Sequence, residues 1–281
     1  MGRLDSKTVR RYLGLLGVAW REPDLATLRE LVKAHLMRVP FENISKLYYR
    51  KHLGLSGLPP IEWFLDGIEK YHFGGTCYSN NFHFYSLLAS LGYAVRLCAA
   101  DMATPDVHMV SMVTVDRREY LLDTGYAAPL LSPLPRDLKT DHVVTLGRDR
   151  YVLKPQDPAG CSRLELYRNG ALKHGYVMKP EPRGLEDFGR VIADSFAGSA
   201  TFLHSVLLAR FWPERSTVIH NLALIQSQGA RSQTYALADR EELIAAIEEN
   251  FAIPRPIVAE AVNEVGTMQD VWGDPVLGGR G

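Results

Sequence analysis

The sequence is poor in cysteine, in long apolar runs and in excess charge of either sign. Its 281 residues hold three cysteines, Cys77, Cys98 and Cys161, and no C-x-x-C pair, which argues against a disulfide framework and a structural zinc site. A balance of 32 basic and 32 acidic residues argues against a nucleic-acid-binding or polybasic membrane-binding surface. No apolar run is long enough to span a bilayer. We therefore expect a cytoplasmic protein with free thiols, no nucleic-acid partner and no membrane.

Helical and strand patterns follow one another in blocks along the chain. Helical spacing of apolar residues covers 5–50, with Asp24 as a predicted N-cap, and further helices are predicted at 61–71 and 77–91, the last ended by Gly92. Short apolar or β-branched runs then predict strands, the second and third of which form a hairpin across a tight turn. The predicted strands are 94–100, 107–115, 120–125, 143–146, 150–153, 163–167 and 171–178.

The remainder of the chain mixes both patterns. A helix is predicted at 186–196, paired strands at 216–228 and 233–237, and a last helix at 257–265. Another helix is predicted to begin at Asp239, with Glu242 completing a capping box. The segment 273–281 is expected to fray. Helices followed by strands and then a mixed segment predict an α+β protein, which could be built as three small units.

Cys77 stands out because two glycines precede it and it opens a predicted helix, in FGGTCYSNNFHFYSLLASLG (73–92). A thiol at a helix N-terminus lies near unpaired N–H groups and the positive end of the helix dipole, and both favour the nucleophilic thiolate. The same N–H groups could hold an oxyanion. The glycine pair would let the backbone turn sharply and approach a substrate. The alternative is a packed thiol, since free cysteines are among the most buried residues.

A thiol nucleophile needs a base, and His108 and Asp123 are the candidates. They lie on the two strands of the predicted hairpin, so they can sit side by side. A carboxylate next to an apolar strand needs a partner, and holding an imidazole through its Nδ1 proton would provide one. Each residue alone could equally be a turn or strand-end residue. Together with Cys77 they favour a Cys-His-Asp triad.

Three ordered stretches carry a resemblance to the arylamine N-acetyltransferase family. RVPFENISKL (38–47) resembles its R-x-P-F-E-N block, and GGTCYSNNFHFYSLLASLGY (74–93) resembles its G-G-x-C segment. HMVSMVTVDRREYLLDTGY (108–126) resembles its block of a His-bearing strand followed by Asp-x-Gly-Phe. The region 195–251 matches more loosely. Together these stretches extend the resemblance over most of the chain.

The resemblance implies a fold of three parts with a cysteine-protease-like catalytic core. An N-terminal helical bundle (1–92) would carry the cysteine, and a central β-barrel-like domain (93–183) would carry the histidine and aspartate. A C-terminal α/β domain (184–281) would pack as a lid. The implied reaction is ping-pong acyl transfer. An acetyl group passes from acetyl-CoA to the enzyme, and then to an arylamine, hydrazine or N-hydroxyarylamine.

The resemblance also assigns residues to roles. Cys77 becomes the nucleophile, His108 the base and Asp123 the group that orients it. Three aromatic residues fall where the family places pocket walls: Phe41, Tyr126 and Phe202. A flat apolar pocket suits an aromatic amine. No metal cluster or dinucleotide fingerprint is present, so the implied cofactor requirement is acetyl-CoA as cosubstrate and nothing bound.

Two departures from the family pattern leave other functions open. Phe73 replaces the usual Arg before the two glycines, so Glu42 needs another partner or must be exposed, and Ala127 replaces a glycine of the Asp-x-Gly-Phe-Gly run. One alternative is an amide synthase of the same fold that uses an acyl carrier protein or another non-acetyl thioester. A second is a catalytically silent binding protein. A papain-like or transglutaminase-like hydrolase shares the triad but lacks the P-F-E-N block.

Two neighbouring polar residues have simpler interpretations. His83 lies on the predicted helix of Cys77 but has no aspartate on a strand as its partner, so it is expected to pack or to cap locally. Cys98, within the apolar strand 94–100, is expected to be a small core residue.

Overall fold

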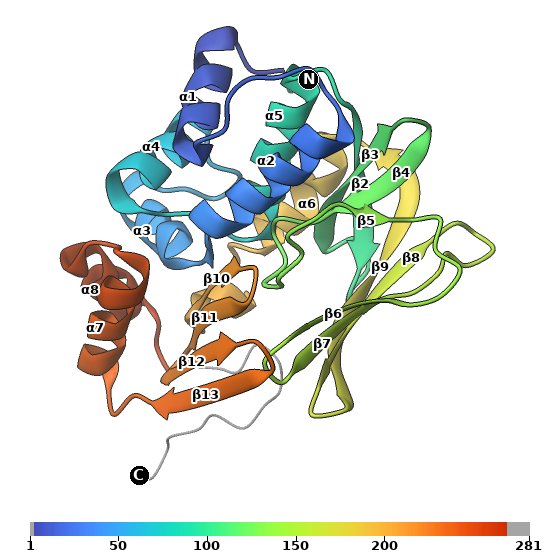
Figure 1. The fold of residues 1–281 in the computed structure, drawn as a ribbon. Coiled ribbons are helices and arrows are strands. Elements are labelled where there is room, and N and C mark those ends of the chain that lie inside the picture. The colour runs from blue at the N-terminus through green and yellow to red at the C-terminus, as the bar shows by residue number, and fades with distance from the viewer. Residues whose placement is uncertain (1–2, 269–281) are drawn as a thin grey trace.

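The computed structural model describes residues 3–268, and its N-terminal part is helical (Figure 1). Its helices are α1 (Ser6–Leu16), α2 (Leu25–Arg38), α3 (Ile44–Leu53), α4 (Ile61–Tyr71) and α5 (Cys77–Ser90). The Asp24 carboxylate accepts a hydrogen bond from Thr27 N at 2.6 Å, which confirms the predicted N-cap. Residues 5–50 are not one helical region, because the two-residue strand β1 (Phe41–Glu42) interrupts them.

The central part of the chain forms a curved, antiparallel sheet of eight strands, a half-barrel beside the helices (Figure 1). Its order is β5-β4-β3-β2-β9-β8-β7-β6. The strands are β2 (Ala94–Asp101), β3 (His108–Val115), β4 (Arg118–Leu122), β5 (Leu134–Pro135), β6 (His142–Leu146), β7 (Asp149–Leu153), β8 (Ser162–Arg168) and β9 (Ala171–Arg183). The predicted β3–β4 hairpin is confirmed. Its turn residues Asp116 and Arg117 both have positive φ, as a tight two-residue connection with the twist of the strands requires.

The C-terminal part combines a second sheet with helices. Its elements are a 3₁₀ helix η1 (Leu185–Phe188), α6 (Gly189–Asp194), a 3₁₀ helix η2 (Thr201–Leu203), β10 (Leu207–Trp212), β11 (Arg215–His220), β12 (Ala223–Gln228), β13 (Arg231–Ala236), α7 (Arg240–Phe251) and α8 (Arg255–Glu264). The five-stranded order is β1-β10-β11-β12-β13, so the sheet takes one edge strand from the N-terminal part. Phe41 pairs with Ala209 and Glu42 pairs with Leu208.

Two sequence-based expectations are wrong in this part of the chain, and one strand was missed. The predicted strand 216–228 is two strands, because Asn221 adopts a left-handed conformation (φ 50°) and turns the chain. Strand β10 was not predicted at all. Asp239 caps α7 as expected, but the Glu242 carboxylate accepts from Ala238 N at 2.7 Å and not from Asp239 N, so the capping box is shifted by one residue. The expected frayed segment 273–281 lies outside the described residues.

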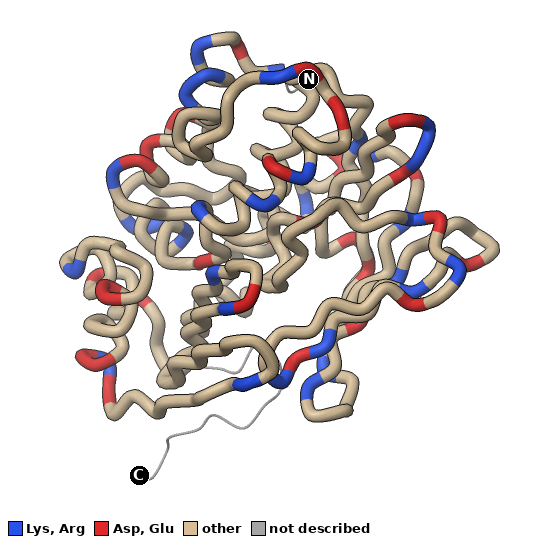
Figure 2. Tube along the Cα trace, in the orientation of Figure 1, with Lys and Arg blue, Asp and Glu red and all other residues tan. Residues whose placement is uncertain are grey.

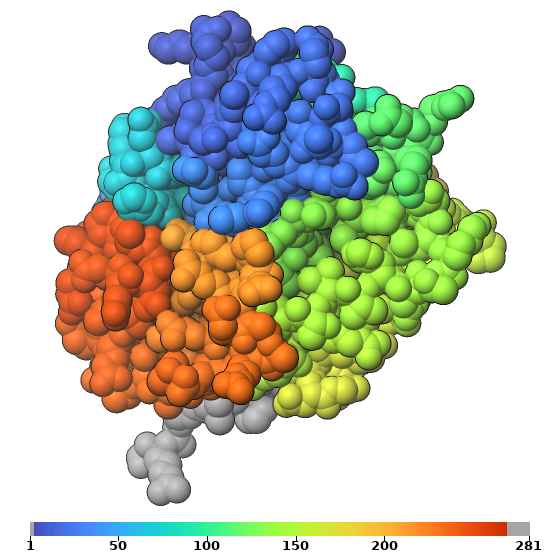
Figure 3. Space-filling model, viewed as in Figure 1, coloured from blue at the N-terminus to red at the C-terminus, as the bar shows by residue number. Residues whose placement is uncertain are grey.

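The three parts pack into one body (Figure 3). A large apolar core joins the N-terminal helices to the half-barrel, and a second joins α3, α7, α8 and the five-stranded sheet. Basic and acidic residues are both spread over the three parts of the chain (Figure 2). Between residues 3 and 268, no helix combines the length and apolarity needed to cross a membrane.

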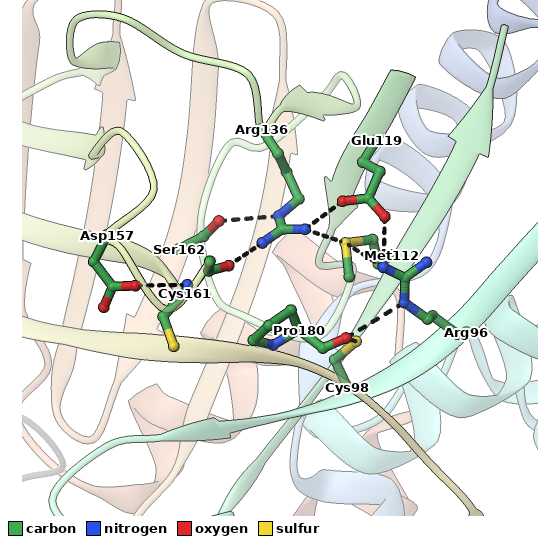
Figure 4. A network of polar contacts seen from close by, with 10 residues as sticks. Arg96, Cys98, Met112, Glu119, Arg136, Asp157, Cys161, Ser162 and Pro180 are labelled. Carbon is green, nitrogen blue, oxygen red and sulfur yellow. Dashed lines mark hydrogen bonds and ion pairs between the residues drawn. The ribbon is translucent and has the colours of Figure 1, made fainter. Parts of the chain in front are cut away.

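The buried side chain of Arg136 links strands of the half-barrel through a network of polar contacts (Figure 4). The side chain of Arg136 is 3% exposed and forms an ion pair with Glu119 at 2.6 Å. It also donates to the Ser162 hydroxyl at 3.1 Å and to the Gly160 carbonyl. Glu119 binds Arg96 from its other oxygen at 2.5 Å. This network links β4 to β2 and β8, and so holds the hairpin that carries His108 in place.

Candidate active site

Cys77 is the first residue of α5, and the loop before it is packed tightly against β1. Gly75 N donates to the Pro40 carbonyl at 3.4 Å, and Glu42 N donates to the Gly75 carbonyl at 3.1 Å. A Cβ on Gly74 would lie 1.9 Å from the Pro40 carbonyl oxygen. Gly74 is therefore needed for packing against Pro40, and a Cβ on Gly75 would lie 2.7 Å from Ser79 Cβ in α5. That the glycine pair also lets the backbone approach a substrate stays a prediction.

The structure brings Cys77, His108 and Asp123 together. His108 begins β3 and Asp123 follows β4, and the His108 Nε2 atom lies 2.7 Å from Asp123 Oδ2. Cys77 and His108 line the same pocket. The predicted use of Nδ1 toward the carboxylate is wrong, because Nε2 makes that contact. His108 Nδ1 is buried and has no hydrogen-bond partner among residues 3–268, so this nitrogen is available to the thiol.

The buried imidazole and carboxylate stabilise each other's charge. Burial opposes a charge on His108, but the Asp123 carboxylate and then the Cys77 thiol raise the pKa of His108 to about 10. Burial also opposes a charge on Asp123, but the His108 ring and hydrogen bonds from Asn81 and Gly125 lower the pKa of Asp123. At neutral pH the ring is thus an imidazolium held by a carboxylate.

Asn81 is a fourth residue of the site that sequence reasoning missed. Its amide nitrogen donates to Asp123 Oδ1 at 2.8 Å and to the Met109 carbonyl at 2.6 Å, and its oxygen accepts from Thr124 N at 2.8 Å. Asn81 follows Cys77 by one helical turn, so the two side chains share a face of α5. That spacing was the available signal. Asn81 thereby ties the helix of the thiol to the loop of the carboxylate.

The thiol opens into a cavity of about 190 Å³ with aromatic walls. All three residues assigned to the pocket line it: Phe41 from β1, Tyr126 after β4 and Phe202 from η2. The rings of Phe41 and Phe202 lie 5.5 Å apart at 60°. His174 of β9 also lines the cavity and was not predicted. Among the described residues on the cavity wall there is no lysine or arginine.

Glu42 does not become exposed when phenylalanine stands at position 73. The Glu42 side chain is fully buried, and its carboxyl group accepts from Gly74 N at 3.1 Å and Ser45 N at 2.8 Å. Burial raises the pKa of Glu42, and these backbone donors oppose the increase. Phe73 packs into a cluster of aromatic rings that includes Tyr49, at 5.7 Å. The Glu42 carboxyl group therefore has backbone N–H groups as partners and not an arginine, while Phe73 packs among aromatic rings.

His83 and Cys98 are structural, as expected. The His83 ring packs 4.5 Å from the Phe64 ring, and its Nε2 atom contacts the Pro59 carbonyl at 3.0 Å. Burial raises the pKa of Cys98 to about 11, so this thiol is not activated. No group of three or more metal-binding side chains occurs between residues 3 and 268.

Comparisons with known proteins bear out the acyltransferase architecture. The family model described as N-acetyltransferase matches residues 24–257. Proansamycin X synthase from Amycolatopsis mediterranei is 26% identical over 85% of this chain and 95% of its own. The pineal gland isozyme of arylamine N-acetyltransferase from Gallus gallus is 30% identical, over 48% of this chain and 49% of its own.

Solved structures give the same result for the fold. The arylamine N-acetyltransferase from Nocardia farcinica superimposes with a TM-score of 0.74 and 27% identity, covering 90% of this chain and 93% of its own. The arylamine N-acetyltransferase from Mycobacterium abscessus superimposes with a TM-score of 0.76 and 20% identity, covering 91% of this chain and 94% of its own. The N-terminal helices, the half-barrel and the second sheet thus form the fold of an acyltransferase. The chain belongs to the arylamine N-acetyltransferase family.

Proposed function

We propose that the enzyme transfers an acetyl group from acetyl-CoA to an arylamine, hydrazine or N-hydroxyarylamine through a thioester on Cys77. The observation that carries this proposal is the meeting of a thiol, a buried imidazole and a buried carboxylate at an aromatic cavity. The aromatic walls formed by Phe41 and Phe202 suit a flat amine. Three free thiols fit a reducing compartment, so we place the enzyme in the cytoplasm.

In the first half-reaction, the Cys77 thiolate attacks the thioester carbonyl of acetyl-CoA. The oxyanion that forms is held by N–H groups in the first turn of α5, which the Thr76 side chain does not cap. When the tetrahedral intermediate collapses, the bond to the CoA sulfur breaks. His108 supplies a proton to the departing thiolate from Nδ1, while Nε2 stays hydrogen-bonded to Asp123.

In the second half-reaction, the amine nitrogen attacks the acetyl-Cys77 carbonyl. His108 Nδ1 now takes the proton that the amine loses, and the carbon–sulfur bond breaks to release the amide and restore the thiolate. Asp123 keeps the imidazole oriented and stabilises its positive charge in both steps. The two steps use one site in turn, so CoA leaves before the amine reacts.

A second candidate is amide synthesis from a carrier-bound or otherwise non-acetyl thioester. Its support is the similarity to proansamycin X synthase over nearly the full length of both chains. The cavity-lining residues within 3–268 also include no lysine or arginine for the phosphates of CoA. The chemistry at Cys77 would be the same, and only the donor would change. An acyl carrier protein would then be a partner in place of free acyl-CoA.

The intact mass of the protein tests both candidates. Purified protein is incubated with acetyl-CoA, with butyryl-CoA, or with an acyl carrier protein loaded with the same groups, and Cys77→Ala is the control. One added acetyl group that disappears when an aromatic amine is added supports the first candidate. Acylation by the carrier protein alone supports the second candidate. No acylation by any donor, with Cys77 slow to alkylate, contradicts both.

A further inference from the structure

Tyr126 and His174 form a second polar pair in the cavity that the acyl transfer steps above do not use. The Tyr126 hydroxyl lies 2.8 Å from His174 Nδ1. Their rings are stacked, with centroids 5.7 Å apart and an interplanar angle of 20°. The Tyr126 ring also meets the His108 ring edge-on, with centroids 5.9 Å apart. Tyr126 therefore contacts both His108 and His174, and Tyr126 and His174 line the same cavity as Cys77.

The contact between Tyr126 and His174 fixes which nitrogen of His174 carries the proton. Burial raises the pKa of Tyr126, so the phenol keeps its proton. His174 Nδ1 is the phenol's one hydrogen-bond partner within residues 3–268. If Nδ1 were the donor, the phenol proton would be left buried and unpaired, which is costly. The phenol therefore donates to Nδ1, and the proton of the neutral imidazole is on Nε2.

The charge state of His174 follows from its surroundings. Burial, and then the positive charge on His108, lower the pKa of His174. A neutral ring with Nδ1 accepting from Tyr126 presents a single N–H donor, at Nε2. His174 Nε2 makes no hydrogen bond to any residue from 3 to 268, and it is not among the fully buried polar atoms. This donor is thus accessible, on a residue that lines the cavity.

The other residues of the cavity wall determine how strongly a substrate depends on the His174 N–H donor. Apart from Cys77, His108, Tyr126, His174 and the exposed Thr201, the described residues that line the cavity are apolar or glycine. A ligand that fills an apolar cavity gains specificity from the few polar groups that it can satisfy. A substrate lacking an acceptor atom would leave the His174 N–H unpaired when it excludes water.

We propose that His174 is a specificity-determining residue whose Nε2–H donates to a hydroxyl or carbonyl oxygen on the substrate, with Tyr126 as its positioning residue. This inference rests on the proposed function, because it concerns the cavity in which that reaction takes place. The oxygen belongs either to the aromatic amine or to the acyl group. Both sources share the same chemistry, an acceptor oxygen within hydrogen-bond distance of His174 Nε2.

A binding experiment tests the inference without requiring turnover. Heteronuclear NMR of the histidine ring nitrogens is recorded on Cys77→Ala, which cannot be acylated. We expect His174 in the Nε2–H tautomer, and we expect its Nε2 proton to shift downfield with aminophenol but not with the matched toluidine. Acetoacetyl-CoA and butyryl-CoA form the second arm. The Nδ1–H tautomer, or equal responses to both members of both pairs, would overturn the inference.

Kinetics with the unmutated cysteine then separate a specificity role from a structural one. In His174→Phe, which keeps a flat ring on Tyr126, the preference for the oxygen-bearing substrate should fall by about tenfold, through KM and not kcat. His174→Gln, which retains a donor near the Nε2 position, should restore most of it. The double variant His174→Phe/Tyr126→Phe leaves no unpaired phenol. A loss of substrate preference in this double variant therefore cannot come from misfolding around an unpaired hydroxyl group. If no variant forms a thioester with any donor, the proposed function fails, while the NMR result still decides the role of His174.

Discussion

His108 and His83 are both buried, with exposed fractions of 1% and 2%, yet burial leaves them in opposite charge states. Burial lowers the pKa of His83 to about 3, against a weak opposing effect of the Pro59 carbonyl. The pKa of His108 rises to about 10, because Asp123 outweighs the same burial cost. The comparison teaches that the carboxylate, and not the depth of burial, distinguishes the imidazole of the candidate active site from the imidazole of the core.

Removing the charge of Asp123 should have the largest effect. Asp123→Asn would place His108 in an environment like that of His83, so its pKa should fall below the ordinary value and thioester formation should slow by about a thousandfold or more. Stopped-flow acylation and NMR titration of the ring measure the two effects.

The matched control for Asp123→Asn is Asp66→Asn, which also removes a carboxylate from ion pairs, here with Arg11 and Lys70 on the surface. It should leave acylation unchanged, since exposed ion pairs contribute little. Activity of Asp123→Asn within tenfold of the unmutated protein would show that the carboxylate is not what distinguishes the two histidines.

Displacing the Asp123 carboxylate should slow acylation less than removing its charge. A Cβ on Gly125 would lie 2.6 Å from Cys77 Cα, and Gly125 N donates to Asp123 Oδ1 at 3.0 Å. Gly125→Ala should therefore shift the loop away from α5 and slow acylation by about a hundredfold. Gly14→Ala is the control, because Gly14 lies in the last turn of α1 and a Cβ there meets nothing within 4 Å.

That glycine control carries an expectation of its own. Gly14→Ala should raise the free energy of unfolding by about 0.5–1 kcal/mol, as expected for alanine in a helix, and leave acylation intact. Denaturant unfolding and the acylation assay report both quantities. Equal activities for the Gly125 and Gly14 variants would mean that the loop after Asp123 tolerates displacement.

The histidines without a carboxylate should make the protein sensitive to acid. Burial lowers the pKa of His35 to about 3, so the unfolded state, with a histidine pKa near 6.5, binds the proton first. Stability is therefore full above pH 6.5 and falls as the pH drops toward 3. His108 acts in the opposite sense, since its contribution is full below pH 6.5 and is lost as the pH rises toward about 10.

Replacing His35 should reduce the acid sensitivity by a measurable amount. At pH 5 one such histidine costs about 2 kcal/mol relative to pH 7, so His35→Leu should lose about that much less than the unmutated protein between these pH values. His35 Nδ1 lies 3.3 Å from the buried Tyr12 hydroxyl, so the substitution should also cost about 1–3 kcal/mol at both pH values by leaving that hydroxyl unpaired. Parallel pH profiles in urea unfolding would contradict the assignment of His35 as a neutral core residue.

Lys46 should show the smallest effect. Its Nζ atom donates to the Ser195 carbonyl at 2.6 Å and hydroxyl at 3.0 Å and lies 4.1 Å from the Phe196 ring centre, but no carboxylate in residues 3–268 pairs with it. Burial lowers the pKa of Lys46 to about 8. Lys46→Met should change the free energy of unfolding by less than about 1 kcal/mol at pH 7, since removing the desolvation cost offsets the lost contacts.

The pH profile sharpens that result. A lysine whose folded pKa is lowered makes the protein gain stability as the pH rises from about 8 to 10.5, and Lys46→Met should lack this gain. Urea unfolding at pH 7 and pH 10 measures it. A loss of several kcal/mol at pH 7 would mean that the contacts with Ser195 outweigh the burial of the charge.

The triad was predictable because each member carries a local signal. Cys77 follows two glycines at a helix start, and His108 and Asp123 flank a hairpin whose tight turn is legible in the sequence. Which nitrogen of His108 faces the carboxylate was not predictable. It depends on the ring rotation that the neighbouring strands impose, and sequence spacing carries no information about that angle.

Other parts of the site had no local signal. His174 lies near the start of β9, far along the chain from Tyr126, so nothing near it in the sequence points to that contact. Strand β10 was missed because its apolar run, with Arg210 within it, lacks the alternation of a half-buried strand. The role of Asn81 could have been predicted, because it lies one helical turn after Cys77 on the same face of α5.

The short strand β1 has a consequence for how the chain can be made. Strand β10 is an apolar edge that finds its partner in Phe41 and Glu42, residues synthesised far earlier. Until the N-terminal segment is in place, that edge offers unpaired N–H and C=O groups to any other chain. A fragment beginning after β9 would therefore be prone to aggregate during expression, and the C-terminal sheet is a poor choice for production as an isolated domain.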